Sequence, residues 1–429
     1  MTMKMRLLSL CVLGLIPAFG EEASDLKIGA AGWIQTTKFV QKDTSYVRGI
    51  DKLSQYAYGS QISLSKQVNS RLAIHAGMGI FVSHFLAYSD NNGGGYAPFY
   101  YSPYPSQGYL DYSVVPEGEH HLSVKFGLFP YDYAEDSRNL GLYLLRGPVY
   151  PGFLLSGFET KAVLPIANML GVQVHHEFGA FSQDFILSSE MDFFPYYDIS
   201  PAYLAFYKNS FMRIGAGINL YHLIAIDDSL TTNRIDVYVD TTNGGSDTTQ
   251  LSFKGTKVMA MGSLDLKALF GSEGSSEDWK IYGEMAIIGL RNTKAYQELY
   301  GDWIHRMPMM LGINLPTFGL ADVFSFEVEW YGAPFADDIT KFTSHTSGRQ
   351  DPFPNNPIAG KNYRRDNWKW SAYLSKVYID HIKVSAQVAN DHSRPGNFKD
   401  YGDNNPPDMR SPFNSLQNWY MTAKVAYFF

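Results

Sequence analysis

The sequence predicts an all-β protein, a transmembrane antiparallel up-and-down β-barrel of about sixteen strands. Three observations lead to this prediction. Apolar and polar residues alternate with a period of two in many segments. Compact and long connections alternate along the chain, and the last predicted strand is rich in aromatic residues. A barrel wall in lipid needs one apolar face, short turns at one end and long loops at the other, so the three observations support one another.

The first element is a predicted secretory signal peptide, residues 1–20. Two basic residues precede the apolar run 7–16, and the small-residue pattern Ala18-Phe19-Gly20 follows it. We expect cleavage there, which leaves residues 21–429 as the barrel. Cys11, the single cysteine, lies within the signal. The mature chain is therefore expected to contain no disulfide, no cysteine nucleophile and no cysteine-bound metal.

The composition favours strands over helices as the membrane-crossing elements. After the signal, no run approaches the roughly 18 apolar residues that a transmembrane helix needs. Aromatic residues make up 15% of the chain, and its 30 tyrosines and 7 tryptophans suit the two membrane interfaces. The net charge of -7 is mild and no basic stripe is present, so nucleic acid is not an expected partner.

Alternation of apolar and polar residues identifies the strands. It is clearest near the C-terminus, where Thr422 and Lys424 lie on the face opposite to an apolar set: Trp419, Met421, Ala423, Val425, Tyr427 and Phe429. The predicted strands lie near 26–36, 53–66, 71–86, 108–115, 121–128, 168–177, 180–188, 200–208, 211–224, 251–268, 278–290, 305–315, 322–332, 368–376, 380–390 and 417–429. Residues 158–166 resemble a further strand. Counting them as one would place a short turn among the long loops, so we assign 129–167 to a loop.

The connections between these strands alternate in length. The compact turns are 66–70, 116–119, 177–180, 208–210, 271–277, 316–321 and 376–379, and the longest connections are 88–107, 227–250, 332–367 and 391–417. Both termini fall on the side of the compact turns and the strand count is even, as in single-chain bacterial barrels. The compact turns are therefore expected to be periplasmic and the long loops extracellular, in a bacterial outer membrane.

The size of the barrel predicts a pore for small hydrophilic solutes or ions, because about sixteen strands leave an aqueous channel. The predicted inward face carries charges of both signs. These are Asp111, Lys125, Asp184, Arg213, Asp265, Lys267, Lys280, Glu284, Glu327, Glu329, Lys369, Lys383 and Lys424. Passive diffusion without catalysis or a cofactor is the expected activity.

The loop 129–167 is the candidate constriction of the pore. It carries the carboxylates Asp132, Glu135 and Asp136, followed by Arg138 and Arg146. Facing charges at a narrow point select permeating ions, so the carboxylates are expected to oppose basic side chains such as Arg146. The alternative is an ordinary extracellular loop.

Short motifs support this interpretation by resemblance. The runs are Val124-Lys125-Phe126-Gly127-Leu128-Phe129-Pro130, Leu144-Leu145-Arg146, and Leu170-Gly171-Val172-Gln173-Val174 leading to Phe185-Ile186-Leu187. They resemble the general porin superfamily, especially its phosphate-selective branch. The resemblance implies a sixteen-stranded homotrimeric barrel with an inward third loop. That branch lines its channel with many arginines, whereas only Arg213 occupies a predicted lumen-facing strand position here, so general solutes or sugars are expected instead of phosphate.

The terminal strand, with Trp419, Val425, Tyr427 and Phe429, is similar to the signal that the outer-membrane assembly machinery reads. That machinery and the lipid of the outer membrane are therefore expected partners.

Other functions were weighed on particular residues. His120-His121 and His175-His176 are poor metal sites, because neighbouring strand residues point to opposite faces. Asp391-His392 resembles an element of outer-membrane proteases, but a solvated loop pair is the simpler reading, and no hydrolase motif occurs.

Two binding alternatives remain open. Six tyrosines in predicted loops could stack on sugar rings or simply pack: Tyr96, Tyr100, Tyr101, Tyr104, Tyr131 and Tyr133. The long loops, such as 332–367, could instead make the chain a surface-binding or adhesin barrel with a plugged lumen. A fatty-acid transporter would need an apolar ligand groove and an N-terminal plug. In the expected mature chain, which starts at residue 21, only about five residues precede the first predicted strand.

Overall fold

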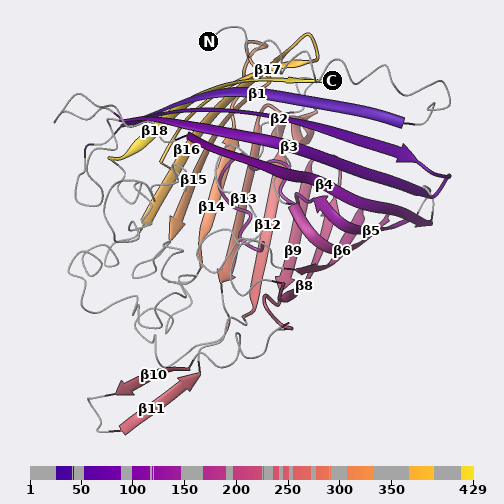
Figure 1. Ribbon diagram of the computed structural model, residues 1–429, viewed down its shortest axis with the longest axis vertical. Helices are drawn as coiled ribbons and strands as arrows, with labels where there is room; N and C mark the ends of the chain where they lie inside the picture. Colours follow the sequence, from indigo (N-terminus) through magenta and orange to yellow (C-terminus); the bar gives the residue numbers. More distant parts are fainter. Residues whose placement is uncertain are drawn as a thin grey trace.

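Sixteen antiparallel strands follow one another around a closed barrel in this computed structural model (Figure 1). The last strand, β18 (Trp419–Phe428), pairs with the first, β1 (Leu26–Val40), and so closes the wall. This confirms the predicted fold class and strand count. The structure describes residues 26–40, 42, 53–87, 99–115, 118, 120–145, 168–189, 197–224, 226, 235–240, 245–250, 255–271, 277–288, 290, 307–331, 367–390 and 417–429. The predicted signal peptide lies outside these residues.

The remaining barrel strands lie in chain order around the wall. They are β2 (Leu53–Gln67), β3 (Leu72–Ala87), β4 (Phe99–Val115), β5 (His120–Pro130), β6 (Asn168–Phe178), β7 (Phe181–Ser189), β8 (Ile199–Lys208), β9 (Met212–Asn219), β12 (Lys257–Asp265), β13 (Lys280–Ile288), β14 (Met309–Asn314), β15 (Val323–Tyr331), β16 (Asn367–Tyr378) and β17 (Ile382–Ala389). A separate hairpin, β10 (Ile235–Asp240) with β11 (Gly245–Gln250), lies beyond one end of the barrel (Figure 1).

The wall has an apolar outer face and a polar inner face. On β15, Ser325, Glu327 and Glu329 are fully buried, while the intervening Phe324 and Phe326 are exposed. Outward side chains elsewhere are large and apolar, such as Phe126 at 60% exposure and Leu311 at 63%. The period of two in the sequence therefore corresponds to the two faces of the wall.

Compact turns join the strands at one end of the barrel, as predicted. Two of them are built on asparagine: the Oδ1 atom of Asn69 accepts hydrogen bonds from the N–H groups of Arg71 and Leu72. Asn209 does the same for the first residues leading into β9. An Asn side chain can replace a backbone acceptor in this way, which explains why so few residues suffice to reverse the chain.

One strand is longer than predicted. β4 begins at Phe99, inside the predicted loop 88–107, and not at residue 108. A bulge at Ser106 interrupts its pairing with β3, because Gly77 pairs with Gln107 and Met78 with Pro105. The extra residue reverses the alternation of faces, which hid the first half of the strand from a search for a period of two.

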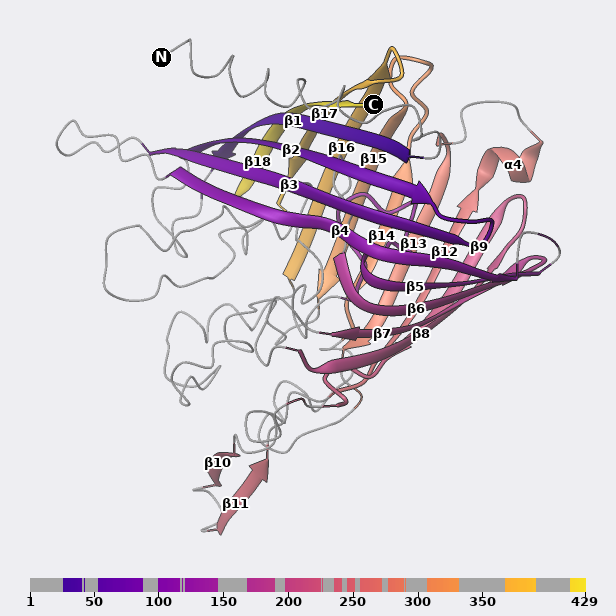
Figure 2. The same cartoon turned by 45° about the vertical axis from the view of Figure 1, so that its right-hand side comes forward.

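The predicted strand 251–268 is corrected at its end. β12 stops at Asp265, and residues Leu266–Phe270 form a short helix, α4, at the turn end of the barrel (Figure 2). The Asp265 side chain accepts from the N–H of Ala268 at 3.0 Å, and Gly271 ends the helix in the left-handed conformation. Lys267 therefore lies on this helix and not on an inward strand position.

Two further boundaries differ from the prediction. β9 ends at Asn219 instead of residue 224, and the predicted loop 227–250 contains the β10–β11 hairpin. In the part of the chain that the structure describes, no helix is long and apolar enough to cross a membrane.

Candidate functional site

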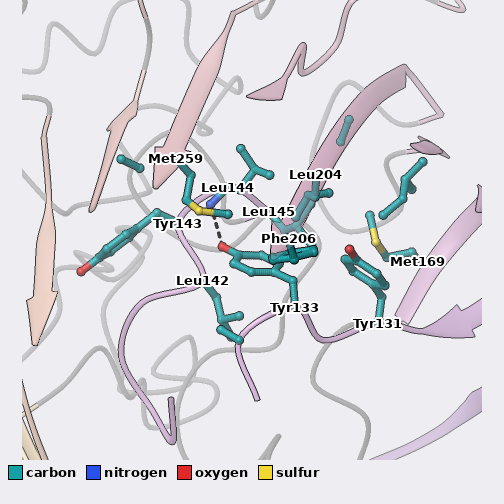
Figure 3. Close-up of a cluster of buried hydrophobic side chains, with 14 of the residues drawn as sticks. Tyr131, Tyr133, Leu142, Tyr143, Leu144, Leu145, Met169, Leu204, Phe206 and Met259 are labelled. Atoms are coloured by element: carbon teal, nitrogen blue, oxygen red, sulfur yellow. Dashed lines mark hydrogen bonds between the residues drawn. The ribbon is translucent and has the colours of Figure 1, made fainter. Parts of the chain in front are cut away.

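Residues 131–145, which follow β5, fold into the interior of the barrel. We call them the inner segment. Their contacts are with inward side chains of the wall from β7 to β16. Tyr133, Leu140 and Tyr143 are buried, and they pack with Leu204 and Phe206 of β8 and with Met259 of β12 in one apolar cluster (Figure 3). The first half of the predicted constriction loop thus lies inside the barrel, and its second half, 146–167 with Arg146, lies outside the described residues.

Glu327 on β15 binds the backbone of the inner segment. Its carboxylate accepts hydrogen bonds from the N–H groups of three consecutive residues, Arg138, Asn139 (2.8 Å) and Leu140 (2.9 Å). The hydroxyl of Tyr282 on β13 donates a fourth at 2.9 Å. Four hydrogen-bond donors therefore converge on one buried carboxyl group.

Glu284 on β13 holds the next turn of the segment in a similar way. It accepts from the N–H groups of Leu142 (2.6 Å) and Tyr143 (2.8 Å) and from the hydroxyl of Tyr133 at 2.8 Å. The hydroxyl of Tyr143 then donates to Glu329 on β15 at 2.8 Å. Three inward carboxylates of the wall therefore fix the backbone and two tyrosines of the segment.

The charged side chains of the segment have partners of their own. Glu135 lies 3.8 Å from Arg213 of β9, and Asp136 accepts from Lys280 of β13 at 3.0 Å. Arg138 pairs with Glu277, which precedes β13. Asp132 accepts from the N–H of Ala134 in its own turn at 2.9 Å. Glu135 and Asp136 thus lie beside cations of the barrel wall, whereas the printed partner of Asp132 is a backbone N–H group.

The segment runs along most of the barrel. Arg138 reaches Glu277 near the compact-turn end, whereas the carbonyl of Leu144 accepts from Asn219, the last residue of β9 at the opposite end. Asn219 pairs with Lys257, the first residue of β12, which confirms its position at the far end of the wall. Beside the segment, a cavity of about 10 Å³, room for one water, is lined by residues that include Asp136, Ser263 and Tyr282.

Two groups of the segment have shifted pKa values. Burial raises the pKa of Tyr131 well above its usual range, and the adjacent Asp184, which accepts its hydrogen bond at 2.9 Å, raises it further. Burial alone would raise the pKa of Asp136, but the charge and hydrogen bond of Lys280, together with Ser263 and Arg138, outweigh it, and the pKa of Asp136 is lowered. The tyrosine is therefore held neutral and the aspartate ionised.

The other predicted pore residues lie on the wall. Lys125 on β5 is in register with Asp111 on β4 and Gln173 on β6. Lys369 on β16 is fully buried and in register with Glu329. Arg213 lies over the ring of Phe206 at 4.6 Å, close to Glu135.

Several residues that organise the site were not predicted to do so. They are Tyr131, Tyr133 and Tyr143, whose hydroxyls donate to wall carboxylates, and Asn139, which donates to Ser371 of β16 at 2.6 Å. Tyr131 and Tyr133 were considered as loop residues that either stack on sugar rings or simply pack, and Tyr143 was not singled out. The repeated Tyr131-Asp132-Tyr133 pattern directly after a strand was the available signal.

The histidine pairs divide between the two faces, as alternation predicts. His121 and His175 lie on the inner face with ring centroids 6.4 Å apart, and His120 and His176 lie on the outer face 6.1 Å apart. The Nδ1 atom of His175 donates a hydrogen bond to the Asp184 carboxylate at 2.7 Å. Among the described residues, no group of three or more His, Cys, Asp or Glu side chains could hold a metal ion. Asp391-His392 lies outside them.

The predicted assembly signal occupies the closing strand. Val425 and Tyr427 point outward and are exposed, as is Phe429, and Trp419 shares their face with partial exposure. Phe429 also exchanges backbone hydrogen bonds with Ala30 of β1, both at 3.0 Å. The reading of this strand by assembly machinery stays a prediction.

Comparison with known proteins shows the fold at low sequence identity. No protein-family model and no curated protein matches this sequence. Among solved structures, the high-pH structure of Pseudomonas putida OprB aligns with a TM-score of 0.54 and 11% identity over 94% of each chain. The fold is that of a porin. Salmonella typhi OmpF in complex with daunomycin aligns at 0.49 and 10% identity, over 96% of this chain and 99% of that one. An engineered mutant of the Rh. blastica porin aligns at 0.43 and 8%, over 94% and 100%.

These likenesses concern the porin fold alone, because each identity lies near 10%. They do not single out the phosphate-selective branch that the short motifs resemble.

Proposed function

We propose that this chain is an outer-membrane channel for the passive diffusion of small hydrophilic solutes, with the inner segment as its constriction. The observation that carries the proposal is the arrangement of a charged, polar interior within an apolar wall. A wall of sixteen strands is wide enough to enclose water. The inner segment lies against the wall from β7 to β16. It leaves the space beside the remaining strands for a narrower channel.

The exposure of the inner side chains supports a passage on the opposite side. Ser63 on β2, His75 on β3, Asp111 on β4 and Lys125 on β5 all remain partly exposed. Glu327, Glu329 and Lys369, which face or adjoin the segment, are fully buried. The proposed path therefore follows the wall from β2 to β6.

The proposal includes a location and partners. The apolar outer face suits outer-membrane lipid, and the closing strand suits recognition by the assembly machinery. The homotrimer is the assembly that the resemblance of the short motifs to the porin superfamily implies. Catalysis is not part of it.

Single-channel recording of the refolded protein in a planar lipid bilayer tests the proposal. We expect stepwise conductance, and steps in groups of three if the trimer is correct. A barrel that inserts, resists protease and never conducts would refute it.

A surface-binding barrel with a closed lumen is the second candidate. The observation that favours it is the complete burial of Glu327, Glu329 and Lys369 inside the wall. The long loop 332–367 that would bind polysaccharide lies almost entirely outside the described residues. The same recording distinguishes the candidates, because a closed lumen predicts no conductance.

A further inference from the structure

The luminal face of β3 and β4 carries a column of aromatic side chains. Phe81 and His75 lie on β3, Tyr104 and Tyr109 lie on β4, and all four are partly exposed. The rings of His75 and Tyr109 stack with centroids 4.4 Å apart and planes 11° apart. Phe81 packs on Trp33 of β1 at 5.6 Å. We call these four residues the aromatic column.

Glycine allows one ring to lie flat on the wall. Tyr104 pairs with Gly79 across the two strands, and a Cβ atom added at Gly79 would lie only 2.6 Å from the Tyr104 hydroxyl oxygen. The ring therefore lies close over the backbone of Gly79, and the Tyr104 side chain stays partly exposed on the inner face. Trp33 covers Gly59 of β2 in the same way, with indole atoms 2.7–2.8 Å from the added Cβ.

The bulge at Ser106 places both tyrosines in the lumen. Residues 104 and 109 are separated by an odd number of positions, so a regular strand would send one of them outward. The bulge adds one residue opposite Gly77 and Met78, and both Tyr104 and Tyr109 then face inward. Tyr101 and Tyr112 of the same strand face outward and are exposed.

Uncharged hydrogen-bonding groups flank the column. Gln61, Ser63 and Ser65 of β2 point inward beside it and are partly exposed, and Ser65 contacts His75 at 3.0 Å. The nearest charges on β4 and β5 are Asp111 and Lys125, which are in register and of opposite sign. The inward side chains of β2 to β5 near the column are therefore aromatic rings, neutral polar groups and one pair of opposite charges. One cation of another strand, Lys424 of β18, lies 4.4 Å from the ring of Trp33, on which Phe81 packs.

We propose that the aromatic column binds the ring of a neutral sugar, so that sugars are the solutes the channel favours. A sugar ring has a C–H face that packs on an aromatic ring and a rim of hydroxyls that need hydrogen-bond partners. The column supplies the first, and β2 supplies the second. An anion such as phosphate would instead require a cluster of cationic donors. The inference rests on the proposed function, because the aromatic column lies along the proposed solute path.

Solute entry into liposomes tests the proposal with glucose and sorbitol as probes. Both carry several hydroxyls and are of similar size, but only glucose has a ring. We expect glucose to enter about threefold faster than sorbitol through the wild-type protein, and this ratio to fall to about one in a Tyr104→Leu/Tyr109→Leu double variant. Tyr112→Leu, an outward change on the same strand, is the matched control and should keep the wild-type ratio.

Two results would overturn the inference: equal entry of the two probes in the wild type, or an unchanged ratio in the double variant. Calorimetric titration of the detergent-refolded barrel with glucose separates it from the proposed function. Glucose binding that the double variant loses supports the column even in a barrel that passes neither salt nor solute. Salt conductance without any glucose binding leaves the channel in place and refutes the column.

Discussion

At the residue scale, Glu327 is the group on which the position of the inner segment depends most. Its carboxylate is fully buried and accepts from three consecutive backbone N–H groups and one tyrosine hydroxyl. Every residue except proline carries the same backbone N–H donor, so the Glu327 acceptor is the partner that a conservative substitution can test. A buried donor that loses its partner costs more than an average hydrogen bond contributes.

We expect Glu327→Gln to lower the free energy of unfolding by about 2–4 kcal/mol. The glutamine NH2 group replaces one acceptor oxygen and would face the N–H and O–H groups that now donate to it. Urea-induced unfolding in lipid vesicles measures this change. Glu177→Gln is the control, since it removes the same charge from a luminal side chain that is 57% exposed and contacts His175 instead of the segment. Equal losses in the two variants would contradict the role of Glu327.

The ion pair between Asp136 and Lys280 should make the segment sensitive to acid. Burial alone would raise the pKa of Asp136, but Lys280, Ser263 and Arg138 together lower it below its ordinary 3.8. A lowered pKa in the folded state contributes stability that is complete above the ordinary value and is lost as the pH falls through the folded-state value. The window therefore lies below about pH 4.

Asp136→Asn is expected to be less stable than the wild type at about pH 6, with the difference shrinking toward about pH 2. Urea midpoints measured across this range test it. Asp380→Asn, an exposed change at the turn after β16, should show no such trend. A difference between wild type and Asp136→Asn that stays constant down to about pH 2 would rule out the ion pair as its cause.

Alternation predicted the inward position of Glu284, Glu327 and Glu329, because a period of two is a local property of the sequence. Their partners were not predictable in the same way. Each contacts a segment that lies 141 to 189 residues away along the chain, and nothing local specifies that register. Asp132, Glu135 and Asp136 were expected to oppose basic residues such as Arg146, which lies outside the described residues. In the structure Glu135 lies beside Arg213 and Asp136 beside Lys280 of the wall, and their role as a constriction stays a prediction.

At the element scale, β4, β5 and β6 meet at a point where only glycine fits. Gly127 of β5 is in register with Gly171 of β6 and with Tyr109 of β4. Gly127 has a φ of +126°, and a Cβ atom there would collide with the carbonyl of Gly108 and lie 2.9 Å from the Cα of Tyr109. Gly127 and Gly171 belong to the two short motifs that resemble the porin superfamily. The close packing of these strands explains why glycine stands at those motif positions.

Gly127→Ala is therefore expected to destabilise the barrel by about 2–4 kcal/mol, through backbone strain and the collision with β4. Gly108→Ala on β4 is the matched control, because a Cβ atom at Gly108 meets nothing within 4 Å. The two variants can be compared by urea-induced unfolding and by refolding yield. A loss of similar size in both would show that the collision is relieved at little cost.

Elements were predicted well where alternation was uninterrupted and poorly where it was not. β4 contains Pro103, Pro105 and the bulge at Ser106, which together removed the period of two from its first half. Residues 99–107 pair with β3, and the described pairing with β5 starts at Gly108, so prolines are tolerated there. The β10–β11 hairpin was missed although Asn243-Gly244, a strong hairpin signal, stands between its strands.

At the scale of the whole molecule, the even strand count followed from the lengths of the connections. The alternation of short and long connections is a global pattern that survives errors in single boundaries. The filling of the interior was harder to foresee, because the inner segment is polar and aromatic and lacks the regular period of a strand. Its conformation depends on hydrogen bonds to a wall that exists only once the barrel has formed.

This dependence has a consequence for the order of events during biogenesis. The inner segment precedes nearly all of its anchors in the chain: Asp184, Glu284, Glu327 and Ser371 are synthesised after it. The segment therefore cannot form these hydrogen bonds until the strands of the C-terminal half have assembled around it. The pairing of β18 with β1, which closes the barrel, also needs the C-terminal end of the chain. A chain that stops before β15 would lack both the closing seam and Glu327, and would leave the assembly pathway with its interior unfilled.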